Sequence, residues 1–243
     1  MPKKSRLDVA LVEQGHFASR EQAQRAVMAG EVRLGDRVLT KSSILVEPEA
    51  ELTVAAPPKY VGRGGLKLEG ALDHFRIDPA GYTALDIGAS TGGFTDCLLQ
   101  RGAAKVYAID VGHGQLAWKI RNDSRVVVRE HINARHLTRT DIPEQIDLCV
   151  IDVSFISLTL ILPNTFQLLT PTGMVVALIK PQFELQPHDV GRGGIVSSAA
   201  LHEKAQEKVR SFLVNQGHIV AGVVPSPITG TDGNQEFFIC ARA

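Results

Sequence analysis

Four charged residues lie at or beside the ends of apolar segments, where together they could move a proton. Asp152 ends CVID, Lys180 ends VVALIK, Glu236 opens EFFICAR, and Lys67 lies in GRGGLKLEGAL. A buried charge is costly unless it is paired or faces a cleft. A lysine can act as a base when partial burial and a second ammonium lower its pKa, and we expect the four groups to titrate as one coupled set.

A glycine-rich segment, LDIGASTGGFTDCLLQRG at 85–102, predicts a site for a nucleotide-like cofactor. A strand ends at Asp86, a turn follows, and a helix begins at about Phe94. Glycines in such a turn let the backbone approach a ligand closely. Ser90 stands where the dinucleotide fingerprint needs its second glycine, which disfavours an NAD-dependent oxidoreductase. The alternative is a tight strand–helix connection that binds nothing.

Two later residues support the cofactor site. Asp110 ends the next strand, VYAID, where its carboxylate can accept hydrogen bonds from both hydroxyls of an adenosine ribose. Asn133, in EHINARHL, either caps a turn or meets the adenine edge. The candidate cofactor-binding residues are Asp86, Gly88, Ser90, Thr91, Gly92, Phe94, Asp110 and Asn133.

The frame that must position these side chains is an α/β domain over residues 66–243. Seven apolar segments alternate with helical stretches: YTALDIGA, AKVYAID, RVVVRE, IDLCVIDV, GMVVALIK, HIVAGVV and EFFICAR. Near-continuous apolar strands between helices are typical of a parallel sheet covered on both faces. Ligands bind such sheets at the carboxyl ends of the strands, where the strand order reverses. The strand-end charges should gather there, although a strand-end lysine is commonly a surface cation.

Residues 1–55 predict a separate, smaller α/β module. Leu7, Ala10 and Leu11 share one face of a short helix, and SREQ at 19–22 is a capping-box pattern that opens a second helix. EVRL and RVLT predict a hairpin. The prolines of AAPPK indicate a linker, which we place at residues 56–65.

Composition narrows the class of protein. The number of Lys plus Arg residues and the number of Asp plus Glu residues are both 26, so any polyanion site must be a local basic patch.

Three cysteines and eight histidines show no metal-ligand spacing, and no metal is expected. The interrupted apolar N-terminus predicts no signal peptide, and the short apolar runs predict no membrane span. The cysteine usage favours a reduced, cytoplasmic location.

These motifs together resemble those of one family. The D-x-G-x-x-x-G-G-F pattern at 86–94 is similar to motif I of S-adenosylmethionine-dependent methyltransferases, and residues 6–43 resemble the S4 RNA-binding fold. The set Lys67, Asp152, Lys180 and Glu236 resembles the Lys-Asp-Lys-Glu tetrad of FtsJ-like ribose 2′-O-methyltransferases. Nearly the whole chain is similar to the TlyA (haemolysin A-like) family of rRNA 2′-O-methyltransferases, through GGLKLEGAL, LDIGASTGGFTD, VIDVSFISL, LIKPQFE and SPITGTDGNQEFF.

The resemblance implies a Rossmann-like methyltransferase sheet behind an S4-like domain, with S-adenosylmethionine as cofactor and ribosomal RNA or ribosomal subunits as partner. It implies Lys180 as the base or hydroxyl-orienting group, Lys67 tuning it and touching phosphate, and the two carboxylates orienting the lysines. It also implies that cations of the first domain face RNA phosphates. Those cations are Lys3, Lys4, Arg6, Arg20 and Arg25.

The pentapeptide VGRGG occurs at 61–65 and again at 190–194, with unlike flanks, so it is not a repeated structural unit. We interpret both copies as mobile basic loops at the edges of an RNA-binding cleft, acting through Arg63 and Arg192. One linker and one surface loop is the plain alternative.

Two rival functions stay open. The chain could be an RNA-binding ribosome assembly factor without turnover. A membrane-lytic haemolysin ranks last, because no segment predicts a membrane-spanning helix.

Overall fold

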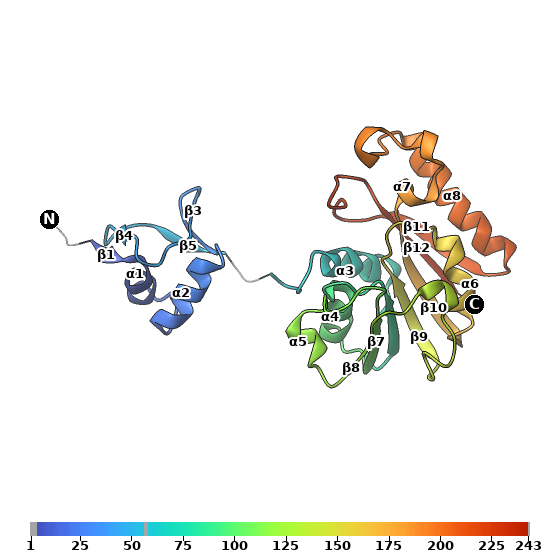
Figure 1. The fold of residues 1–243 in the computed structure, drawn as a ribbon, viewed down its shortest axis with the longest axis horizontal. Helices are drawn as coiled ribbons and strands as arrows, with labels where there is room; N and C mark the ends of the chain where they lie inside the picture. Colours follow the sequence, from blue (N-terminus) through green and yellow to red (C-terminus); the bar gives the residue numbers. More distant parts are fainter. Residues whose placement is uncertain (1–3, 56–57, 243) are drawn as a thin grey trace. The chain divides into compact units, whose positions relative to one another are not determined.

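Buried apolar side chains fall into sets that belong to two separate units. The computed structural model describes residues 4–55 and 58–242. One core lies within residues 7–52, and two more lie within residues 60–241. The chain accordingly divides into Met1–Pro58 and Lys59–Ala243 (Figure 1). The second unit begins inside the segment predicted as linker, because Tyr60 is already buried in its core.

The N-terminal unit combines two helices with two small antiparallel sheets. Its elements are β1 (Ser5–Arg6), α1 (Leu7–Glu13), α2 (Arg20–Met28), β2 (Val32–Leu34), β3 (Arg37–Leu39), β4 (Leu45–Val46) and β5 (Leu52–Val54). Ser19 caps α2 by accepting a hydrogen bond from the N–H of Gln22. β2 and β3 form the predicted hairpin, with Gly35 at φ +57° in its turn. β5 pairs with β2, and β1 with β4.

The C-terminal unit is built on one seven-stranded sheet. Its strands are β6 (Thr83–Ile87), β7 (Lys105–Ile109), β8 (Val126–Arg129), β9 (Ile146–Ile151), β10 (Leu169–Ile179), β11 (Ile219–Pro225) and β12 (Phe237–Arg242). They lie in the order β11-β12-β10-β9-β6-β7-β8. β12 runs antiparallel to the other six strands of this sheet, so its first residues lie at the carboxyl edge of those strands. The strand order reverses between β6 and β9, which predicts the ligand site there.

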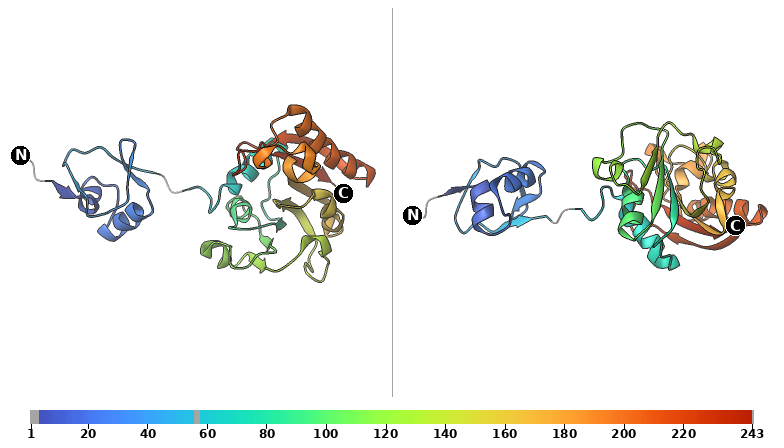
Figure 2. Two further views of the ribbon diagram at one scale, coloured as in Figure 1. Left: turned by 45° about the horizontal axis from the view of Figure 1, so that its top comes forward. Right: turned by 90° about the horizontal axis from the view of Figure 1, so that it is seen from below.

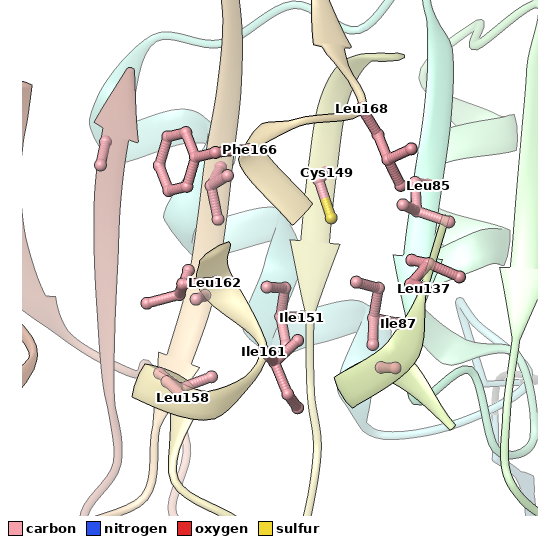
Figure 3. Close-up of a cluster of buried hydrophobic side chains, with 14 of the residues drawn as sticks. Leu85, Ile87, Leu137, Cys149, Ile151, Leu158, Ile161, Leu162, Phe166 and Leu168 are labelled. Atoms are coloured by element: carbon pink, nitrogen blue, oxygen red, sulfur yellow. The ribbon is translucent and has the colours of Figure 1, made fainter. Parts of the chain in front are cut away.

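Helices cover both faces of this sheet. Residues of α3 (Gly64–Phe75), α4 (Gly93–Gln100) and α5 (Trp118–Arg121) enter one core, and residues of α6 (Leu162–Phe166) and α8 (Ala199–Asn215) enter the other (Figure 2). Figure 3 shows the second core, where Leu85 and Cys149 of the central strands lie among leucines and isoleucines. Burial on both faces explains why the strands read as continuous apolar runs. The short α7 (Pro181–Glu184) follows β10.

Candidate active site

The reversal point between β6 and β9 separates two cavities that share one wall. Gly88, directly after β6, has φ +84°, and a Cβ there would lie 2.2 Å from the carbonyl oxygen of Asp152. Only glycine fits at this position. The residues that line both cavities are Gly88, Ser90, Asp152, Ser154 and Phe155. Ligands in the two cavities would therefore meet at this wall.

The first cavity, called the Lys180 cavity here, has a volume of about 250 Å³ and is lined by all four candidate catalytic residues. Lys67 reaches it from α3, and Asp152 and Lys180 directly follow β9 and β10. Glu236 arrives because β12 is antiparallel: Phe237 pairs with Ile179, which places Glu236 level with Lys180 at the edge of the sheet. The structure thus brings the four residues together.

Their side chains form two ion pairs. Lys67 Nζ lies 2.5 Å from Glu236 Oε2, and the two residues are 8% and 2% exposed. Lys180 Nζ lies 2.6 Å from Asp152 Oδ1 and 3.0 Å from Ser154 Oγ. The contact with Asp152 lacks hydrogen-bond geometry, so Oδ1 is buried without a hydrogen bond from any described residue. The ion pair with Lys180 is therefore the contact that stabilises this buried oxygen.

The second cavity, called the Asp110 cavity, has a volume of about 370 Å³. Its apolar lining residues include Ile87, Ile109, Val111, Ile132, Ile156 and Ile161. Asp110 Oδ2 accepts from the N–H of Ser90 at 2.8 Å, and Oδ1 from the N–H of Gly112 at 2.7 Å. Each carboxylate oxygen has a further lone pair, so the carboxylate is held in place and can still accept hydroxyl hydrogens. An apolar slot with one fixed carboxylate fits an adenosine whose ribose meets Asp110.

Asn133 caps a turn, as one of its two predicted roles requires, and its position also allows the other. It lines the Asp110 cavity, and its Oδ1 accepts from the N–H of Arg135 at 3.1 Å, which caps the short 3-10 helix Ala134–His136. The cap uses the amide oxygen and leaves the amide nitrogen as a donor for an adenine edge.

Six of the eight predicted cofactor residues line a cavity, namely Gly88, Ser90, Thr91, Phe94, Asp110 and Asn133. Asp86 is fully buried, where it accepts a hydrogen bond from Thr95 Oγ1 at 2.6 Å and ties β6 to α4. Gly92 has φ +95° where α4 begins. Neither residue lines either cavity, and both help to form the turn, so their direct contact with the cofactor stays a prediction.

Asp86 also predicts a pH dependence of stability. Burial raises its pKa to about 7; the hydrogen bond from Thr95 opposes the rise and the charge of Asp152 adds to it. Because the folded-state pKa lies above the unfolded one, the stabilising contribution is full below about pH 4 and is lost as the pH rises through about 7. We expect the free energy of unfolding, measured in urea, to fall less between about pH 5 and about pH 8 in Asp86→Asn than in the parent. An equal fall in the free energy of unfolding in both proteins would show that Asp86 does not cause the pH dependence.

Several side chains of the Lys180 cavity were not predicted from the sequence, among them Phe155, Gln182 and Phe183. Phe155 is 90% exposed at φ +64°, a strained conformation for a bulky residue, and its ring centroid lies 5.0 Å from that of Phe183. Gln182 Oε1 is buried with no partner among the described residues. The sequence does hold one signal for these residues. Phe155 follows Asp152 closely, in DVSF, and Gln182 and Phe183 follow Lys180, in KPQF. The exposed ring of Phe155, beside the partly buried Phe183, offers a surface on which a nucleobase can stack.

In the N-terminal unit, two predicted RNA-binding arginines converge on one buried carboxylate. Asp8 is fully buried and accepts hydrogen bonds from Arg6 at 3.0 and 3.1 Å and from Arg20 at 3.1 Å. Arg6, more than any other neighbour, holds the pKa of Asp8 well below its usual range. Both arginine side chains stay about half exposed, so their outer N–H groups can still meet phosphate.

The other cations predicted for this unit are more loosely held. Lys4 pairs with Glu47 at 2.8 Å, and both side chains are exposed. Such surface pairs contribute little stability and exchange readily for another anion. Arg25 is exposed and donates to the carbonyl of Glu21 at 3.4 Å. Lys3 lies outside the described residues.

The two VGRGG segments contact the same loop, the β11–β12 connection of residues 226–236. Arg63 lines the Lys180 cavity and donates to the carbonyl of Thr229 at 3.1 Å. In the second copy the carbonyl of Gly194 accepts from the Asn234 side chain at 2.9 Å. Arg192 is exposed and lines neither cavity. The copies differ in structure, since the first leads into α3 and the second forms a short 3-10 turn at Arg192–Gly194.

Within residues 4–55 and 58–242, no cluster of His, Cys, Asp and Glu is arranged to hold a metal ion. No helix in these ranges combines the length and apolar character needed to cross a bilayer. The three cysteines are buried and free.

The fold and the two cavities define an S-adenosylmethionine-dependent methyltransferase. Residues 60–243 match the FtsJ-like methyltransferase family, and residues 5–52 match the S4 domain. A solved S-adenosylmethionine-dependent methyltransferase from Mesorhizobium loti shares the fold, with a TM-score of 0.56 at 16% identity over 75% of this chain and 100% of that one. The predicted fold class is confirmed, and S-adenosylmethionine is the cofactor.

The chain belongs to the FtsJ-like methyltransferase family, among relatives named TlyA and hemolysin A. The 16S/23S rRNA (cytidine-2′-O)-methyltransferase TlyA of Mycobacterium tuberculosis is 44% identical over 244 residues, 100% of this chain and 91% of its own. Hemolysin A of Brachyspira hyodysenteriae is 42% identical over 96% of this chain and 97% of its own. A solved candidate hemolysin from Streptococcus thermophilus is 45% identical over 100% of this chain and 89% of its own, with a TM-score of 0.75. The predicted family is confirmed.

Proposed function

We propose that this protein transfers the methyl group of S-adenosylmethionine to a ribose 2′-hydroxyl of ribosomal RNA. The observation that carries the proposal is the Lys180–Asp152 pair beside the wall shared by the cavity that fits adenosine and the cavity that holds the tetrad. The S4 domain supports RNA as the substrate class. A relative of 44% identity, named for cytidine 2′-O-methylation of 16S and 23S rRNA, supports the ribose hydroxyl as acceptor.

The tetrad suits this reaction because a ribose hydroxyl is a weak nucleophile and a positioned group must manage its proton. When bound, the cofactor supplies an electrophilic methyl group with sulfur as the leaving atom. Lys180 is the base or hydroxyl-orienting group, with Nζ held by Asp152 and Ser154. The buried Lys67–Glu236 pair adds a second, fixed ammonium to the same cavity. Holding the ribose hydroxyl at Lys180, beside the wall shared with the Asp110 cavity, would supply much of the rate by orienting the hydroxyl toward the cofactor.

The proposal is tested by transfer of labelled methyl from S-adenosylmethionine to isolated ribosomal subunits, followed by mapping of the label. We expect the label on a ribose 2′-oxygen at one or a few positions. Binding to subunits without any labelling would favour the non-catalytic assembly factor. Lysis of synthetic vesicles by the pure protein, with no labelling of RNA, would favour a membrane-lytic function.

Removal of residues 1–55 is expected to weaken RNA binding and flatten its salt dependence, because the cations lost no longer displace counterions from RNA. Cofactor affinity should survive, because the Asp110 cavity lies wholly within the second unit, which has its own cores. Filter binding across a salt series and calorimetry with S-adenosylmethionine measure the two effects. A truncated protein with the parent's RNA affinity and salt slope would show that the first domain does not bind this RNA.

Arg63→Ala and Arg192→Ala should each weaken RNA binding across sequences and lower the salt slope by roughly one unit. Neither should change cofactor affinity, because both residues lie outside the Asp110 cavity. Arg242→Ala is the matched control, since Arg242 is exposed at the far end of β12, on the opposite edge of the sheet. If both test variants bind and methylate RNA like the parent, the VGRGG segments are only connectors.

A further inference from the structure

The buried side chain of Asn234 joins the second VGRGG segment to the loop that leads into Glu236. Asn234 is 1% exposed. Its Oδ1 accepts from the N–H of Val196 at 2.9 Å, and its Nδ2 donates to the carbonyl oxygen of Gly194 at 2.9 Å. Both polar atoms of the amide are therefore engaged, and they satisfy two backbone groups of the 190–196 segment.

The backbone of Asn234 extends this connection to the tetrad. Its carbonyl accepts from the N–H of Gly230 at 2.9 Å, which closes a turn in which Gly233 has φ +85°. Gly230 packs directly on Glu236, since a Cβ at that glycine would lie 2.7 Å from Glu236 Oε1. The other carboxylate oxygen, Oε2, is the one that meets Lys67. The position of this turn thus limits where the Glu236 carboxylate can lie.

We propose that Asn234 is a positioning residue for methyl transfer. It clamps the β11–β12 connection to the second VGRGG segment and so holds Glu236 against Lys67. The first VGRGG segment contacts the same connection at another point, through the hydrogen bond from Arg63 to the carbonyl of Thr229. The inference rests on the proposed function and deepens it: a contact of RNA with the segment that carries Arg192 would reach the Lys67–Glu236 pair through one buried amide.

Asn234→Ala tests the clamp directly. We expect the rate of methyl transfer at saturating RNA to fall by about tenfold, because Glu236 would shift and misplace Lys67, and a misplacement of about 1 Å can cost up to about a hundredfold in rate. The affinity for S-adenosylmethionine should stay at the parent value, and hydrogen exchange at the Val196 amide should become faster. Asn215→Ala is the matched control because Asn215 is exposed at the end of α8, and it should behave like the parent.

A Glu236→Gln background separates positioning from general stability. If Asn234 acts through Glu236, Asn234→Ala should cost little additional single-turnover rate in that background. Equal losses in both backgrounds, or weaker cofactor binding, would overturn the inference. If Asn234→Ala fails to fold, Asn234→Asp serves in its place, since it keeps the acceptor for Val196 and loses the donor to Gly194. A parent protein that labels no RNA would instead overturn the proposed function, so the two failures are distinct.

Discussion

Lys180→Ala is expected to slow methyl transfer by roughly a thousandfold, within the range that a positioned acid–base group contributes. The variant loses the group that meets the acceptor hydroxyl, and it leaves the Asp152 carboxylate without its ion-pair partner. Cofactor affinity should hardly change, because Lys180 does not line the Asp110 cavity. Single-turnover transfer of labelled methyl measures the first effect, and calorimetry with S-adenosylmethionine measures the second.

Two companion variants sharpen this test. Lys204→Ala is the matched control, since Lys204 pairs with Asp189 at the surface, and its turnover should equal that of the parent. Lys180→Arg keeps the charge and the donors but cannot give up a proton. Substantial activity in this variant would assign hydroxyl orientation to Lys180, and inactivity would assign the base. Parent-like turnover in Lys180→Ala would remove Lys180 from the chemistry.

Asp110→Ala should produce the opposite pattern, with cofactor affinity reduced by about tenfold to a hundredfold through loss of hydrogen bonds to a charged acceptor. The variant removes the carboxylate that would receive the ribose hydroxyls, and it frees the N–H groups of Ser90 and Gly112 that now hold the turn. RNA affinity should be retained, because the first domain is untouched. Equilibrium calorimetry with S-adenosylmethionine checks the first expectation.

Asp78→Ala is the matched control for this variant. Asp78 is exposed and accepts a hydrogen bond from the N–H of Ala80, away from either cavity. Its cofactor affinity should equal that of the parent. Unchanged affinity in Asp110→Ala itself would exclude Asp110 from the cofactor site.

The local sequence pattern was sufficient to predict many of the secondary-structure elements that position the site. All seven strand segments, the Ser19 cap and the hairpin around Gly35 were predicted from periodicity and turn residues, because these features depend on neighbours in the chain. The glycine-rich turn after β6 was predicted for the same reason. The sequence also placed Asp152 and Lys180 at one edge, since both follow strands of a parallel sheet.

What the sequence by itself determined is therefore the class of fold, the order of the elements and the types of residue at the strand ends. Tertiary structure alone decided which charges pair, as Lys67 and Glu236 meet across 169 positions only because β12 turns antiparallel beside β10. The tertiary structure also decided that Asp86 is buried beneath the turn and that Phe155 faces solvent. It likewise decided that both VGRGG segments contact the β11–β12 connection. Such contacts depend on strand direction and packing between distant segments, and local periodicity carries no information about either.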